Sequence, residues 1–136
     1  MNYIQEQFLP YKESLELKKL GFNEECFFIR IKEDPFNLYN CSDYEDFPEN
    51  KDKEIGTPLY QQAFDWFLEK HDLNGWVDCN KEENWIWTIN FVKYGDYIQS
   101  DDHIEDLENL PEFYNTKKEA QLACIQQLIK LVKEKQ

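Results

Sequence analysis

The chain has 136 residues, the size of one ordinary domain, and its formal net charge at neutral pH is −13. Aromatic residues make up 16% of it, a richness that disordered chains lack, so we expect a folded protein. The negative charge and the single arginine, Arg30, disfavour direct binding of DNA or RNA, which depends on Lys and Arg contacts with phosphates.

The cysteines and the N-terminus indicate the cellular compartment. Cys26, Cys41, Cys79 and Cys124 include no pair at the spacing of a redox or zinc motif. The first residues lack the basic and apolar runs of a signal peptide, and no apolar run approaches the roughly 20 residues of a membrane span. We therefore expect a cytoplasmic protein with reduced thiols and no membrane partner. Cys124 falls in the apolar stripe of a predicted helix and is expected to pack in the core.

The first predicted element is a helix over residues 11–20. Pro10 suits the first turn, where a missing N–H costs nothing. Gly21 supplies the left-handed residue that ends many helices, and Phe22 can then pack back on Leu17 as in a Schellman cap.

Residues 26–32 have a period of two and predict a strand with one apolar face, made of Phe27, Ile29 and Ile31. The pair Asp34–Pro35 is expected to break this strand, and residues 38–41 to form a short partner strand. Residues 42–56 are expected to be an acidic loop.

A second helix is predicted up to residue 70, with Thr57 as its N-cap and Pro58 at its first position. Its wide apolar stripe comprises Leu59, Tyr60, Ala63, Phe64, Phe67 and Leu68.

Two strands are predicted next, over residues 76–80 and 85–94. The core face of the second comprises Trp85, Trp87, Ile89 and Phe91. Residues 95–115 are predicted to be another acidic connection. The capping box of Thr116 and Glu119 then predicts a last helix. Its apolar side comprises Ala120, Ala123, Cys124, Leu128, Leu131 and Val132.

These elements predict an α+β protein that forms a single domain over residues 1–136. The order is helix, strand, short strand, helix, strand, strand, helix. A mostly antiparallel sheet of three or four strands packed against three helices accommodates this order.

Three stretches carry a family resemblance: FLPYKESLELKKLGF over 8–22, PLYQQAFDWFLEK over 58–70 and EAQLACIQQLI over 119–129. In this order they resemble a family of small uncharacterised proteins from gut-type bacteria and their phages and prophages. The resemblance spans most of the chain, and PLYQQAF is its most specific part. It implies a phage-related context, and no activity or functional residue comes with it.

Motifs of catalysis and metal binding are absent from the sequence. The four glycines stand alone, which excludes the glycine patterns of phosphate loops and nucleophile elbows. Residues 101–112 carry acids at three positions of a calcium loop, but Asp106 replaces the required glycine and His103 stands at the third position. We expect no catalytic residue, no cofactor and no metal. The stretch 101–112 is a solvated acidic loop or, as an alternative, a weak cation site.

The residues expected to contact a partner are acids and tryptophans. Residues 94–116 hold seven acids and neither Lys nor Arg, so they repel phosphates and attract basic surfaces. An exposed tryptophan typically anchors a protein interface, although packing in the core remains an alternative for both candidates. The candidate partner-binding residues are Asp101, Asp102, Glu105, Asp106, Trp66 and Trp76.

Three functions fit these observations. The first is a phage- or prophage-related accessory protein that binds another protein with a basic surface. The second is an acidic mimic of nucleic acid that inhibits a DNA-binding host protein. The third is an enzyme whose site the sequence does not reveal. Carboxylates on one face at phosphate spacing would favour the second, and a deep pocket with convergent polar groups would favour the third.

Overall fold

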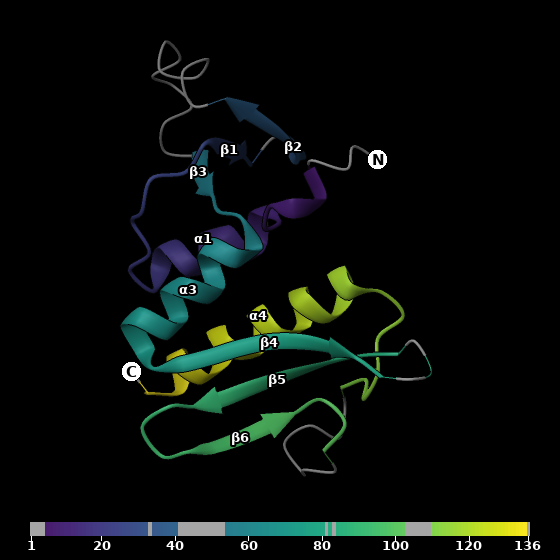
Figure 1. Ribbon diagram of the computed structural model, residues 1–136. Coiled ribbons are helices and arrows are strands. Elements are labelled where there is room, and N and C mark those ends of the chain that lie inside the picture. The colour runs from purple at the N-terminus through teal and green to yellow at the C-terminus, as the bar shows by residue number, and fades with distance from the viewer. Residues whose placement is uncertain are drawn as a thin grey trace. The chain divides into compact units, whose positions relative to one another are not determined.

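The computed structural model describes residues 5–32, 34–40, 54–80, 82, 84–102 and 110–135 (Figure 1). Within these residues it contains three α-helices and two three-stranded antiparallel sheets, so the α+β class is confirmed. The strands are divided between two sheets, where we had expected one sheet of three or four strands.

The chain divides into two compact units, Met1–Ala63 and Phe64–Gln136. The boundary falls inside helix α3 (Tyr60–His71). The single domain expected over residues 1–136 stays a prediction. The number of unfolding transitions would test it, because one cooperative domain unfolds in one step.

Unit 1 contains η1 (Gln5–Gln7), α1 (Tyr11–Lys19), β1 (Phe28–Ile31), β2 (Asp34–Asn40) and β3 (Glu54–Thr57). The strand order is β2-β1-β3, with β1 antiparallel to both neighbours, and α1 packs against β3. The buried apolar side chains of this unit include Leu9, Leu17, Phe22, Ile29, Ile31 and Ile55.

Two strands of unit 1 differ from the prediction. Strand β1 ends at Ile31, before the pair Asp34–Pro35, as expected, but the partner strand β2 already begins at Asp34 and not at residue 38. Strand β2 is an edge strand, and an edge tolerates a proline without an N–H. Strand β3 lies in the predicted loop, and Thr57 ends it instead of capping α3. The Thr57 hydroxyl bonds to the Ser14 hydroxyl at 2.7 Å and donates to the Leu9 carbonyl at 2.8 Å.

The predicted apolar face of β1 is only partly correct. Ile29 and Ile31 are buried, but Phe27 lies before the strand and is 79% exposed. Arg30, which we had assigned to the polar side, is only 5% exposed. Its Nε–H donates to the Leu9 carbonyl at 2.7 Å and its Nη1–H to the Pro35 carbonyl at 3.2 Å, so the guanidinium joins three segments of unit 1.

The predicted cap of α1 is confirmed. Gly21 has a φ of +108°, the Gly21 N–H donates to the Lys18 carbonyl, and the Phe22 N–H donates to the Leu17 carbonyl at 3.0 Å. These two hydrogen bonds define the Schellman motif.

Changing Gly21 to alanine is expected to lower the free energy of unfolding by about 1–2 kcal/mol. No atom lies within 4 Å of the added Cβ, so the cost is that of the positive φ alone. Gly56→Ala is the matched control, because its Cβ would meet Cys26 Sγ at an ordinary 3.4 Å and its φ is not positive. Urea unfolding followed by circular dichroism measures both. Equal midpoints for the two variants would contradict the assigned cap.

Unit 2 contains the rest of α3, β4 (Leu73–Cys79), β5 (Trp85–Phe91), β6 (Asp96–Gln99) and α4 (Lys117–Lys135). The strand order is β4-β5-β6 and all pairs are antiparallel. Helix α4 packs against β4 and β5 along one face of the sheet (Figure 1). The side chains buried in this unit include Leu73, Trp87, Ile89, Cys124, Ile125, Leu128 and Val132.

Gly75 lies in a close contact between β4 and the helices of unit 2. A Cβ built there would lie 3.0 Å from Cys124 Sγ, 3.0 Å from Leu128 Cδ1 and 3.3 Å from Phe64 Cδ1. Cys124 is fully buried, as predicted, and its burial raises the pKa of the thiol. At the start of α4, Thr116 Oγ1 accepts the Glu119 N–H at 3.1 Å, which confirms the predicted N-cap.

Candidate functional site

The two candidate tryptophans lie in different surroundings. Trp66 on α3 is 4% exposed, and its ring packs edge-on against Phe67 and His71, with centroids 5.1 and 5.0 Å away. Trp76 on β4 is 36% exposed, and its indole N–H donates to Asp78 Oδ2 at 2.9 Å. Only Trp76 therefore offers a substantial surface to a partner.

The candidate acids follow β6 directly. Asp102 Oδ2 accepts the Gln99 N–H at 2.7 Å, and the Asp102 N–H donates to the Gln99 carbonyl at 3.1 Å. This compact turn fixes Asp101 and Asp102 at the end of the strand, and both are half-buried. Glu105 and Asp106 lie outside the described residues.

The strand register brings Trp76 and the end of β6 together. Trp76 pairs with Thr88 on β5, and Thr88 pairs with Gln99 on β6. Because neighbouring strands are about 4.8 Å apart, the backbones of Trp76 and Gln99 are separated by about 10 Å. The Gln99 side-chain N–H donates to Thr88 Oγ1 at 3.2 Å, and Thr88 is buried between its two neighbours.

A second row of side chains lies beside the first on the same face. It comprises Asn74 on β4, Asn90 on β5 and Tyr97 on β6, and Tyr97 is 60% exposed. This face points away from α4, because side chains alternate along a strand and Gly75 faces Cys124 and Leu128 on that helix. We call these two rows, with Asp78, the outer face of the sheet.

Tyr97 and Gln99 were not among the predicted site residues, because residues 95–115 were predicted to be a loop. The signal available was the alternation in Asp96-Tyr97-Ile98-Gln99, which is four residues long. Ile98 faces the same side as Ile89, and Tyr97 faces outward with Asn90. So short an alternation predicts a strand only weakly.

The charges around the outer face are negative. Asp78 is on this face, and Asp101 and Asp102 follow Gln99 directly. The stretch between Lys93 and Lys117 has neither lysine nor arginine. The Asp78 carboxylate is exposed, whereas Asp101 and Asp102 are half-buried and one Asp101 oxygen is buried. Carboxylates attract cationic groups within a Debye length, about 8 Å at physiological salt. The outer face therefore combines two exposed aromatic rings with an acidic margin.

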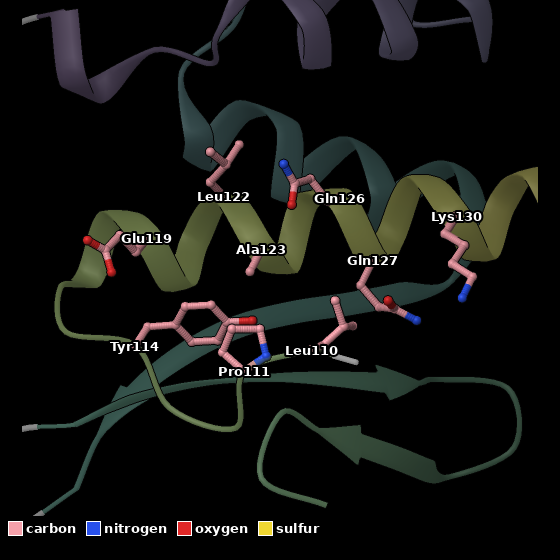
Figure 2. A pocket seen from close by; sticks show the side chains of 9 residues that line it. All are labelled: Leu110, Pro111, Tyr114, Glu119, Leu122, Ala123, Gln126, Gln127 and Lys130. Atoms are coloured by element: carbon pink, nitrogen blue, oxygen red, sulfur yellow. The ribbon is translucent and has the colours of Figure 1, made fainter. Parts of the chain in front are cut away.

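A large pocket lies on the other side of unit 2, between α4 and residues 110–114 (Figure 2). Its volume is about 720 Å³, and Ala123 and Gln127 project from α4 toward Tyr114 and Leu110. The charged residues that line it are Glu119 and Lys130. Eleven residues of helix place these about 16 Å apart, too far to act on one substrate atom.

The described residues give no support to a metal-binding function. Within them, no group of three or more His, Cys, Asp or Glu side chains could hold a metal ion. Cys79 and Cys124 are free thiols. Asp78 faces outward, whereas Asp96 pairs with Phe91 on the α4 side of the sheet.

No described helix combines the length and the apolar character needed to cross a membrane. Comparison of the chain with protein-family models, with curated proteins and with solved structures found no match. The function is therefore inferred from the geometry of the site.

Proposed function

We propose that this chain is an accessory protein that binds another protein through the outer face of the β4-β5-β6 sheet. The observation that carries the proposal is the row of Trp76, Thr88 and Gln99, with exposed Tyr97 in the neighbouring row. Tryptophan and tyrosine dominate the binding energy of protein interfaces, because they bury a large area at a small entropic cost. The family resemblance supplies the proposed phage-related setting, and the cysteine spacings and the N-terminal sequence supply the proposed cytoplasmic one.

The partner proposed for this face presents a basic surface. Arginine or lysine side chains favour the faces of tryptophan and tyrosine rings and also pair with carboxylates. Asp78 supplies a carboxylate in contact with Trp76, and Asp101 and Asp102 supply two more just after β6, the strand that carries Tyr97. Duplex or single-stranded nucleic acid carries the same negative charge as these carboxylates and is therefore disfavoured as the partner.

The double variant Trp76→Ala, Tyr97→Ala is expected to lose a partner that wild-type protein captures from lysate of the source organism. The control is Phe27→Ala, Phe36→Ala, which removes two aromatics that are more exposed, 79% and 84%, and that belong to unit 1. Mass spectrometry of the captured proteins identifies a partner that the control retains. The affinity of that partner for the Trp76→Ala, Tyr97→Ala variant (the face variant) is expected to fall about 30-fold, the effect of removing an interface hot spot.

Salt dependence tests the acidic margin separately. Association of the identified partner is expected to slow as salt rises, and the double variant Asp101→Asn, Asp102→Asn is expected to slow it at low salt.

Equal capture by the face variant and the wild type would overturn the proposed site. Tight binding of a DNA or RNA duplex near 0.15 M salt would overturn the assigned partner class.

A further inference from the structure

A second pocket, of about 430 Å³, lies at one end of unit 2. The end of α3, the start of β4, the turn between β5 and β6 and the end of α4 meet there (Figure 1). Most of the residues that line it are polar or charged: Lys70, His71, Asp72, Lys93, Tyr94 and Lys135. No residue from the two rows of the outer face lines this pocket.

The charge of this pocket is opposite to that of the chain. Three lysines face one aspartate, Asp72, in a protein whose formal net charge is −13. Charges further away than a Debye length are largely screened, so the local lysines dominate the potential inside the pocket. An anion that the protein as a whole repels is therefore attracted at this position.

The helix ends explain only part of this cluster. Lysines in the last turn of a helix stabilise its dipole, which accounts for Lys70 on α3 and Lys135 on α4. Lys93 is in the turn after β5 and has no such role. Among the residues that the structure describes, none of these three lysines forms an ion pair. Their ammonium groups remain available to a ligand.

His71 adds a neutral donor to the lysines. Burial lowers the pKa of its imidazole, the charge of Lys135 lowers it further, and Asp72 opposes both effects. The ring packs edge-on against Trp66 and obliquely against Phe67, which restricts its orientation. At neutral pH the imidazole is therefore mostly neutral and has one N–H to donate.

We propose that this pocket binds a small phosphate ester, with the phosphoryl group among Lys70, Lys93 and Lys135 and the organic group against Phe91 and Tyr94. Lysine ammonium groups are common phosphate ligands. The volume exceeds that of a phosphate ion, and the 77% exposed Tyr94 ring supplies a flat surface for the remainder of the ligand. This site is independent of the proposed protein-binding face.

A nucleic acid is a poorer occupant than a small ester. Its affinity depends on many phosphate contacts along an extended basic groove. The basic groups here are confined to one pocket, and exposed Asp96 lies nearby, paired with Phe91 at the pocket edge. A ligand with one phosphoryl group satisfies the cluster without bringing further phosphates against acidic surface.

Nuclear magnetic resonance titration of the His71 imidazole tests the site, with phenyl phosphate and inorganic phosphate as probes. Phenyl phosphate is expected to shift the His71 signal in a saturable manner and to raise the pKa of His71, because a bound anion stabilises the protonated ring. Sodium chloride at equal ionic strength is expected to do neither. Inorganic phosphate is expected to bind more weakly, since it lacks the ring that contacts Tyr94.

Three single variants complete the experiment. Lys93→Gln and Lys135→Gln are expected to weaken phenyl phosphate binding about fivefold each, the effect of losing one exposed charge pair. Lys117→Gln is the matched control, because Lys117 is an exposed lysine at the other end of α4. Lys135→Gln is also expected to raise the pKa of His71 without ligand, because it removes a nearby positive charge.

Four results would overturn the proposal. They are the absence of a saturable shift with phenyl phosphate, an equal shift with chloride, equal weakening by Lys117→Gln, and phenyl phosphate binding no tighter than inorganic phosphate. None of them bears on the outer face, because Trp76 and Tyr97 are unchanged in every variant.

Discussion

Replacing Gly75 with valine is expected to lower the free energy of unfolding by about 3 kcal/mol, the upper part of the usual range for overpacking a core. Even the first added carbon would lie 3.0 Å from both Cys124 Sγ and Leu128 Cδ1. The γ-carbons of valine have no free volume between β4 and α4, so the strand or the helix must move. Urea unfolding followed by tryptophan fluorescence measures the loss, because all four tryptophans lie after residue 63.

The adjacent position supplies the control for this variant. Asn74→Val adds the same β-branched side chain to the same strand, but on the outer face of the sheet. Its unfolding midpoint is expected to remain close to the wild-type value, since a surface change away from special features typically alters stability by less than about 0.5 kcal/mol. A Gly75→Val midpoint equal to that of Asn74→Val would show that β4 and α4 are not so closely packed.

Changing Arg30 to methionine is expected to destabilise unit 1 by about 3 kcal/mol. The guanidinium donates charge-assisted hydrogen bonds to the Leu9 and Pro35 carbonyls, and methionine supplies neither. Burial lowers the pKa of Arg30, and Tyr60 acts in the opposite direction. The positive charge of Arg30 lowers the pKa of Tyr60, so removing the cation is expected to raise that pKa.

Unit 1 has no tryptophan, so the loss is best measured by amide hydrogen exchange in β1 and β3. Lys32→Met is the matched control, because Lys32 follows β1 directly and is exposed. Faster exchange in Arg30→Met alone is the expected result. Equal exchange in the two variants would mean that the buried guanidinium contributes nothing to the stability of the sheet.

Features that depend on neighbouring residues in the chain were predictable. The cap at Gly21 and the N-cap at Thr116 follow local rules, and both are confirmed. The burial of Cys124 followed from helical periodicity. The division into two sheets was not predictable, because it depends on pairings such as Arg30 with Ile55, which no local pattern encodes.

The candidate site was predicted only in part. Trp76, Asp101 and Asp102 were identified from exposure and charge, and the register brings them to one sheet. Trp66 was a candidate on the same grounds as Trp76, but it is buried. A residue beside an apolar stripe is buried or exposed according to what packs on it, which the sequence does not reveal. Tyr97 was missed, because its strand is short and lies in a stretch dominated by acids.

The place where the two units meet along the chain limits how this protein can be divided into fragments. Tyr60 belongs to the polar cluster around Arg30, whereas Phe64, one helical turn later, contacts the position of Gly75. Expressing the two units separately would divide α3 into pieces of four and eight residues, both below the roughly 12 residues that an isolated helix needs. A cut after Asp72 would instead deprive the second unit of Phe64. Each fragment is therefore expected to lack a helix segment that the intact chain supplies.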